Sequence, residues 1–316
     1  NANRVPINYT IPPDIDREID FGTTNLRQLN EQSLSLEVCD LQDGFSKFAF
    51  RSMNLDVRQY GKLKMFAHAE AGDDGSVLND NDVSVVIRLG TDFQNNYYEY
   101  EVPLAVTFPG QNLPDQVWPE SNEIDLPFDR LVNVKQNRNR LSITPGNGVS
   151  ITRTFEAQDG KNIIRVKGNP NLGEIRVIMI GVKNPKAGPG NLNDDGQPKC
   201  AEVWVNELRL SDFNNKGGWA ATARMTAQIA DLGSVNLSGT YSTPGWGSLE
   251  QKLNERQRET RQQYDLAASL DLAKLLPEGA NVSIPMYYSV SESVIRPQFN
   301  PLDPDIELQE LLSSNE

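Results

Sequence analysis

Hydrophobic and polar residues alternate along much of the chain, the pattern expected of β-strands that bury one face. Between residues 33 and 213 the alternating runs are short, and residues that favour turns separate them, as at Pro145-Gly146-Asn147-Gly148. This spacing predicts an antiparallel β-sandwich domain of the jelly-roll kind over residues 1–215, which includes an irregular N-terminal arm. The runs lie at residues 34–38, 47–53, 62–70, 83–90, 97–104, 140–143, 149–155, 163–168, 174–182 and 202–210, with a weak helical pattern at 125–136.

Residues 216–316 show alternation in longer runs. The runs cover residues 219–230, 235–242, 264–272 and 281–291. Short turns at 231–233 and 274–280 alternate with a long polar connection at 243–263, an asymmetry typical of transmembrane β-barrels. A soluble β-meander would show the same alternation, so two interpretations stay open. The membrane interpretation predicts about four strands of a transmembrane β-barrel with long outer loops, and four strands cannot close a barrel by themselves.

Alternation assigns the residues of these runs to two faces. In a barrel the polar face lines the lumen and the apolar face meets lipid. The lumen-facing candidates are Thr222, Arg224, Thr226, Gln228, Asn236, Ser238, Thr240, Ser269 and Asp271. The lipid-facing candidates are Met225, Ile229, Val235, Leu237, Leu270, Val282, Ile284 and Met286. An aromatic belt is expected near the long-loop ends, from Trp219, Tyr241, Trp246, Tyr264, Tyr287 and Tyr288.

The composition narrows the class of protein. The 316 residues carry a formal net charge of −13, which argues against nucleic acid as a partner and against attachment to anionic lipid through a basic patch. No apolar run reaches the roughly 18 residues that a transmembrane helix needs. The N-terminal residues have neither a basic start nor an apolar core, and the last residues close no evident element. We therefore expect the chain to be a fragment of a longer protein.

Candidate chemistry is sparse. His68, the one histidine, has no nucleophile-elbow serine to serve and is expected to be structural. Cys39 and Cys200 match no metal spacing; they form either a disulfide between neighbouring strands or two buried thiols. The acidic stretches 72–82 and 191–197 offer oxygen ligands for calcium without the spacing of an EF-hand, so solvated turns are the simpler interpretation.

Several long strings carry a resemblance to a known family. They are NEQSLSLEVCDLQDG, RQYGKLKMFAHAE, IRLGTDFQNNYYEYEVPL, KGNPNLGEIRVIMIGVKNP, EVWVNELRLSDFNNKGGWAA, SLEQKLNERQRET and SVIRPQFNPLDPDIELQELL. They resemble the SprA/Sov family, the outer-membrane translocons of the type IX secretion system, which are called gliding motility proteins in some bacteria. The resemblance extends over nearly the whole chain, in the order of the family. The resemblance implies a very large single-chain barrel in the outer membrane, through which folded cargo proteins reach the cell surface.

The resemblance also implies partners. They are secreted cargo proteins with a C-terminal signal domain, a PorV-like barrel protein at a lateral opening, a periplasmic plug protein, and outer-membrane lipid. It assigns no gate or cargo-binding residue. A channel needs no catalytic residue, cofactor or metal, so we expect none and no enzymatic activity. If the short turns face the periplasm, the sandwich lies at the cell surface.

Two rival functions remain at this stage. A surface carbohydrate-binding β-sandwich module would stack sugars on aromatic side chains. Its candidates are Tyr97, Tyr98, Tyr100, Trp118 and Trp204, although strand alternation places some of them in a core. A β-sandwich hydrolase would need a pair of carboxylates in a cleft, which an acidic chain supplies by chance.

Overall fold

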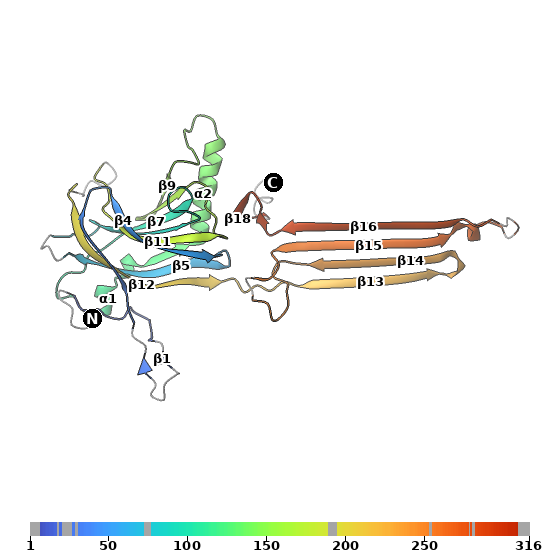
Figure 1. The fold of residues 1–316 in the computed structure, drawn as a ribbon, viewed down its shortest axis with the longest axis horizontal. Helices are drawn as coiled ribbons and strands as arrows, with labels where there is room; N and C mark the ends of the chain where they lie inside the picture. Colours follow the sequence, from blue (N-terminus) through green and yellow to red (C-terminus); the bar gives the residue numbers. More distant parts are fainter. Residues whose placement is uncertain are drawn as a thin grey trace. The chain divides into compact units, whose positions relative to one another are not determined.

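The computed structural model describes residues 7–17, 19–20, 27–28, 31–72, 77–188, 195–252, 255–277, 279 and 282–308. The chain divides into two compact units, Asn1–Asn214 and Asn215–Glu316, which we call unit 1 and unit 2 (Figure 1). In both units the sheets are antiparallel, which confirms the predicted all-β class. In the described part of the chain, no helix is both long and apolar enough to cross a membrane.

Unit 1 contains a six-stranded and a four-stranded sheet, with strand orders β4-β11-β6-β7-β10-β9 and β3-β12-β5-β8. The strands are β3 (Leu34–Leu41), β4 (Ser46–Leu55), β5 (Tyr60–Ala71), β6 (Ser84–Gly90), β7 (Tyr97–Pro103), β8 (Ile124–Pro127), β9 (Phe155–Asp159), β10 (Asn162–Lys167), β11 (Ile175–Lys183) and β12 (Lys199–Phe213). The arm before them contains the short strands β1 (Ile19–Asp20) and β2 (Arg27–Gln28).

The strand pairing in unit 1 is that of a jelly roll. Without the β9–β10 hairpin, eight strands remain, and they pair first with last (β3 with β12), second with seventh (β4 with β11), third with sixth (β5 with β8) and fourth with fifth (β6 with β7). A long hairpin wrapped into two facing sheets gives this nested order. The β9–β10 hairpin then extends the six-stranded sheet beyond β7. The predicted jelly-roll-like sandwich is confirmed.

The inner faces of the two sheets share one hydrophobic core. Alternate residues of β5 and β12, such as Ala67 and Val203, pack in one cluster with residues of β6 and β7, such as Ile87 and Tyr100. Alternation along each strand therefore buries one face against the opposite sheet.

Two of the expected strands are wrong. Residues 140–143 are the last turn of helix α2 (Phe128–Ile143), and residues 149–154 lie outside any strand. The helix buries the polar residues Lys135 and Arg138 along with its apolar positions. Their cationic heads donate to the carbonyl oxygens of Pro170 (2.7 Å) and Gly168 (2.6 Å). A hydrophobicity pattern scores both residues as exposed, so it hid the face of the helix that packs on the sheet.

The outer face of the four-stranded sheet is also covered. The N-terminal arm and the short helix α1 (Pro114–Val117) lie over it, and Ile7, Val117, Trp118 and Trp204 form a second small core there. The indole of Trp118 donates to the carbonyl of Thr10 at 2.8 Å, which fixes the arm to the sandwich.

A disulfide joins Cys39 on β3 to Cys200 on β12, with their Cα atoms 4.0 Å apart. It sits where the register between the two strands shifts, between Lys199 and Ala201. Of the two alternatives that the sequence left open, the structure has the disulfide. Disulfides of this kind persist in oxidising compartments, including the periplasm and the cell surface.

Removing this bond should destabilise unit 1. The disulfide closes a loop with a sequence separation of 161 residues, and Cys39→Ser should lower the free energy of unfolding by about 2–5 kcal/mol. Thermal denaturation with and without reductant measures this. The variant should melt at the temperature of the reduced wild type, and a variant that melts with the oxidised wild type contradicts the prediction.

A network of charges crosses the outer face of the six-stranded sheet. Glu101 on β7 is buried, and its carboxylate accepts hydrogen bonds from Lys183 (2.7 Å) and from Arg165. Arg165 also pairs with Glu99 at 2.9 Å. Burial raises the pKa of the Glu101 carboxyl, but the two cations outweigh burial and hold that pKa below its usual value.

The lowered pKa of Glu101 predicts a pH dependence. A carboxyl whose pKa is lower in the folded than in the unfolded state stabilises the fold above its ordinary pKa of 4.5, and this stabilisation disappears as the pH falls through the folded value. Glu101→Gln should cost roughly 3 kcal/mol at neutral pH and flatten the loss of stability below about pH 4. Denaturant titrations between pH 3 and 7 measure both effects; an unchanged pH profile would contradict the assignment.

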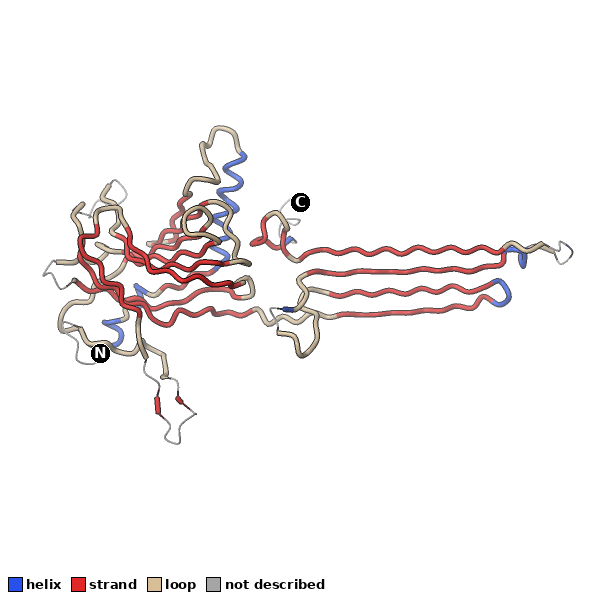
Figure 2. Tube along the Cα trace, viewed as in Figure 1, coloured by secondary structure: helices blue, strands red, loops and turns tan. Residues whose placement is uncertain are grey.

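Unit 2 is an antiparallel meander of four strands, in the order β13-β14-β15-β16. The strands run side by side, with helical turns at one end of the sheet (Figure 2). Their bounds are β13 (Ala220–Ile229), β14 (Gly233–Ser242), β15 (Glu259–Asp271) and β16 (Pro285–Pro297), with 3-10 turns η2 (Ala230–Leu232) and η4 (Leu272–Leu275) and a small hairpin of β17 (Phe299–Asn300) and β18 (Asp303–Glu307). The last two long strands extend beyond the runs visible in the sequence.

Candidate functional site

The candidate site is the sheet of unit 2, because its register sorts the side chains of all four strands into two faces. Met225 lies opposite Leu237, which lies opposite Leu266, which lies opposite Val290. Directly opposed residues in an antiparallel sheet point to the same side. In the middle of the sheet apolar residues therefore meet apolar ones and polar residues mostly meet polar ones. Toward the long-loop end the sorting is less strict, because Tyr264 lies opposite Glu292 and Tyr241 lies opposite Gln262.

All nine lumen-facing candidates lie on the polar face of the sheet. Arg224, Ser238, Asp265 and Ser291 form one cross-strand row of this face. The other polar candidates sit in the neighbouring rows, and Asp271 lies at the end of β15. The structure thus places on one face residues that belong to different strands.

Six of the eight lipid-facing candidates lie on the apolar face. Within this face Met225 is 54% exposed and Leu237 is 40% exposed in unit 2. The six are Met225, Ile229, Val235, Leu237, Leu270 and Met286. Val282 and Ile284 come before β16, in the connection from β15, so the structure does not place them in the sheet. Whether these faces meet lipid and water remains a prediction.

The polar face is hollowed. A shallow depression of about 450 Å³ is lined mainly by polar-face residues of all four strands, among them Arg224, Asn236, Asp265 and Ser291. Hydrogen bonds tie this lining together: Thr226 Oγ1 donates to Asn236 Oδ1 at 2.9 Å, and the Asp265 carboxylate accepts from Ser291 and from Gln263 Nε2 at 3.2 Å. Several of the polar side chains of this face are therefore hydrogen-bonded to one another.

Aromatic residues lie toward both ends of the sheet. At the long-loop end the rings of Trp219 and Tyr241 are 5.0 Å apart, and Tyr264 lies one row away. Tyr287 and Tyr288 lie opposite Ser269 and Ala268, near the short-turn end. The expectation that all of these aromatics gather at the long-loop end is wrong. Tyr287 and Tyr288 lie near the start of β16, and β16 starts at the short-turn end. The alternating run in the sequence does not show at which end of the sheet a strand begins.

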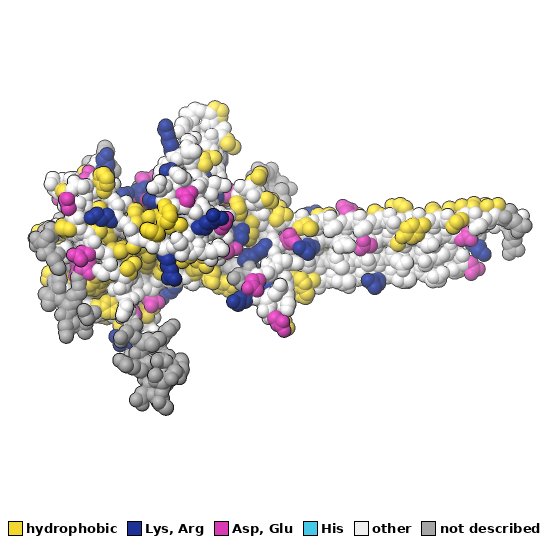
Figure 3. All heavy atoms as spheres, viewed as in Figure 1, with side chains coloured by type: hydrophobic (Ala, Val, Ile, Leu, Met, Phe, Trp, Pro, Cys, Tyr) yellow, Lys and Arg dark blue, Asp and Glu magenta, His cyan; other side chains and the backbone are white. Residues whose placement is uncertain are grey.

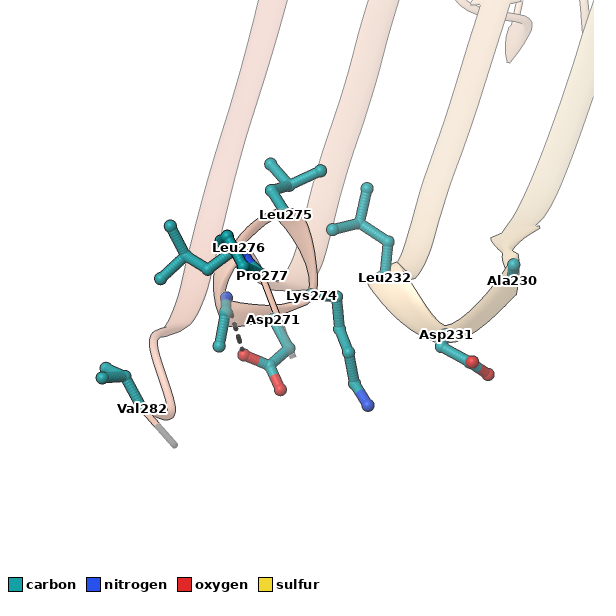
Figure 4. A pocket seen from close by; sticks show the side chains of 10 residues that line it. Ala230, Asp231, Leu232, Asp271, Lys274, Leu275, Leu276, Pro277 and Val282 are labelled. Atoms are coloured by element: carbon teal, nitrogen blue, oxygen red, sulfur yellow. Dashed lines mark hydrogen bonds between the residues drawn. The ribbon is translucent and has the colours of Figure 1, made fainter. Parts of the chain in front are cut away.

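The two short turns meet at one end of the sheet. Figure 4 shows Asp271 at the start of η4, where its carboxylate accepts from the backbone N–H of Ala273 at 3.2 Å. A hollow of about 630 Å³ lies between this turn and η2. Its lining includes Leu232, Leu275 and Val282. The described lining holds a single cationic side chain, Lys274 (Figure 4).

The chemical candidates of unit 1 are structural. His68 is fully buried; its Nδ1 lies 2.8 Å from the Val117 carbonyl oxygen, and its ring stacks on Trp204 with 4.1 Å between centroids. Among the described residues no group of three histidine, cysteine, aspartate or glutamate side chains is arranged to hold a metal ion. The aromatic residues considered for sugar stacking are all buried: Tyr97, Tyr98, Tyr100, Trp118 and Trp204.

The two acidic stretches meet around a lysine. Asp82 and Asp195, which are far apart in the sequence, both contact the ammonium of Lys199, at 3.1 and 2.9 Å. Burial lowers the pKa of Lys199, but the two carboxylates outweigh burial and raise it overall. A protein ammonium thus occupies the position between these carboxylates. Residues 73–76 and 189–194, which belong to the same two stretches or border them, lie outside the described part.

The chain was compared with known proteins. The family model SprA_N, described as motility related/secretion protein, matches residues 1–312. The chain belongs to this family. The match confirms the resemblance to the SprA family and makes motility or secretion the general role of the chain. SprA_N is a family of motility and secretion proteins rather than of enzymes. None of the curated proteins compared with the chain matches it.

Sequence reasoning missed part of the polar face in this SprA_N member. The residues that it left out are Ser234, Gln263, Asp265, Ser289, Ser291 and Ser293. They continue the same alternation, Ser234 in β14 and the others in β15 and β16, so extending the period of two in both directions would have found them. The polar loop before Tyr264 concealed the start of β15, because Glu259, Arg261 and Gln263 do not look like a strand in isolation.

Glycines on β14 provide a test of this sheet. At Gly233 (φ +145°) an added Cβ would approach the Ser269 carbonyl oxygen to 2.0 Å, whereas at Gly239 the nearest atom, the Gln263 carbonyl oxygen, is 3.8 Å away. Gly233→Ala should separate β14 from β15 and cost roughly 1–3 kcal/mol, and Gly239→Ala should be tolerated. Resistance of the protein to unfolding in detergent during a heating series measures both; equal behaviour of the two variants would contradict the register.

Proposed function

We propose that unit 2 forms four strands of the wall of a large outer-membrane β-barrel, and that this barrel conducts folded cargo proteins to the cell surface. The observation that carries the proposal is the register that aligns apolar side chains on one face and polar side chains on the other. A sheet of a soluble sandwich buries its apolar face against a second layer. Within unit 2 the apolar face has large hydrophobic side chains in the open, including Met225 and Tyr288.

A barrel would account for the apolar and polar faces of the unit 2 sheet and for its two edge strands. Lipid covers the apolar face and water fills the space over the polar, hollowed face. Strands β13 and β16 each pair with a single strand in the described sheet, so each presents an open edge. An open edge is not tolerated in a bilayer, because its backbone groups have no partners there. Further strands on both sides would complete the wall.

The dimensions of the sheet also suit an outer membrane. The row of Tyr241 and the row of Tyr288 are six residues apart along β16, about 20 Å at the usual rise of a strand. Transmembrane barrels carry an apolar band about 25 Å tall between two aromatic girdles.

The chain connectivity suggests an orientation. Ala220, where β13 begins, pairs with Ser242, where the long loop begins. The segment before β13 therefore leaves the sheet at the long-loop end. In outer-membrane barrels the short turns face the periplasm, which would put the jelly roll of unit 1 at the cell surface. The disulfide of unit 1 is compatible with that oxidising location.

The proposed partners follow the family. They are secreted cargo proteins with a C-terminal signal domain, a PorV-like barrel protein at a lateral opening, a periplasmic plug protein and outer-membrane lipid. This channel requires no catalytic residue and no cofactor.

The proposal is tested by a scan of single cysteines from Val235 to Tyr241 in the intact parent protein, labelled with a probe that distinguishes lipid from water. Cys39 and Cys200 can stay, because their disulfide does not react with thiol probes. We expect lipid exposure at 235, 237, 239 and 241 and water exposure at 236, 238 and 240. Water exposure at all seven positions, or burial in protein at all of them, would refute the barrel wall.

A further inference from the structure

The polar face of unit 2 is poor in charge. In its four rows that begin at Thr222, Arg224, Thr226 and Gln228 of β13, twelve of the sixteen side chains are serine, threonine, asparagine or glutamine, and Ala267 and Tyr287 are the uncharged exceptions. In these rows of the described sheet the charged side chains are Arg224 and Asp265, which share one row and cancel. The chain as a whole is 23% charged with a net charge of −13, so its acidic character lies elsewhere.

The charge of Asp265 is also shielded by its neighbours. Ser238 Oγ (3.4 Å), Gln263 Nε2 (3.2 Å) and Ser291 Oγ all donate to its carboxylate. The face of the sheet seen in Figure 3 is mostly white, the colour of uncharged polar side chains and backbone, with few charged side chains among them. The large aromatic on the polar face, Tyr287, lies near the short-turn end rather than in the middle.

We propose that this wall segment is a non-adhesive lining that does not discriminate the surface charge of its cargo. The inference rests on the proposed function and adds a property of the cargo: folded proteins of either net charge pass this wall equally. Transport through a channel requires contacts weak enough to leave. A charged wall would hold cargo of opposite sign within the Debye length of about 8 Å, and an apolar wall would hold exposed hydrophobic patches. Hydroxyl and amide side chains that bond to one another and to water do neither.

The test uses the intact parent in its own outer membrane and two versions of one secreted cargo, with the same C-terminal signal and opposite surface charge. A photo-crosslinking residue at Thr240, which lies opposite Thr222 on the polar face, reports contact during passage. For the wild-type wall we expect acidic and basic cargo to crosslink with yields within about twofold of each other, because Arg224 and Asp265, the charged side chains of these rows, are opposite in sign and share one row.

Three substitutions add charge without placing like charges directly opposite one another. Thr222→Lys, Gln228→Lys and Ser289→Lys lie in different rows of the polar face. Together they should raise the acidic-to-basic crosslinking ratio at least about fivefold, and the matched glutamate set should lower it by a similar factor. The control is Thr222→Gln with Ser289→Gln, which has similar bulk without charge and should behave as wild type.

The outcomes separate the inference from the proposed function. A wild-type ratio far from one, or a ratio that does not change in the lysine and glutamate sets, overturns the non-discriminating lining. If cargo reaches the surface and neither version ever crosslinks at Thr240, this face does not line the path, and the proposed function fails as well.

Discussion

The register of the four-stranded sheet is the constraint on which the functional interpretation depends. Side chains alternate with a period of two, so a slip of one residue between β14 and β15 would move Leu266 into the row of Ser238 and mix the two faces. The observed register keeps Met225, Leu237, Leu266 and Val290 in one row. Gly233 contributes to this, because β15 approaches β14 so closely there that a Cβ would not fit. Amphipathic strands form an amphipathic sheet only when their register keeps the apolar residues of neighbouring strands opposite one another.

Unit 1 is also built of antiparallel strands, but its sheets bury their apolar faces inside the unit. Its two sheets bury their inner faces against each other, and the nested pairing of the jelly roll brings the first and last strands together. That pairing places Cys39 beside Cys200 and Asp82 within reach of Lys199. Residues with apparent chemical potential, such as His68 and the aromatic cluster, are used here for packing. We therefore interpret the sandwich as a stable structural module and place the candidate functional surface in unit 2.

The general function and the detailed function rest on different kinds of support. Membership of the SprA_N family carries the role in motility or secretion. The conducting wall and its lack of discrimination by cargo charge are proposals from the geometry of one sheet, and the proposed partners follow the family. They are linked: the same polar face that would be wet in a barrel is also the face on which charges are few and mutually compensated. A channel for many folded proteins gains from such a surface, because a strong attraction to any one of them would slow all the others.

Much of this protein could be predicted from its sequence, because strand alternation is a local property. The all-β class, most strands of unit 1, the jelly-roll-like sandwich and both faces of the unit 2 hairpins follow from periodicity and turn residues. Three features did not follow from the sequence pattern: the helix over residues 140–143, the early start of β15 and the positions of Tyr287 and Tyr288. The helix was missed because Lys135 and Arg138, which are polar, are buried only where the helix packs against the rest of unit 1. Tertiary structure alone decided the disulfide, the meeting of the acidic stretches at Lys199 and the cross-strand rows. Each depends on which distant strands pair and in which register, and no single strand contains that information.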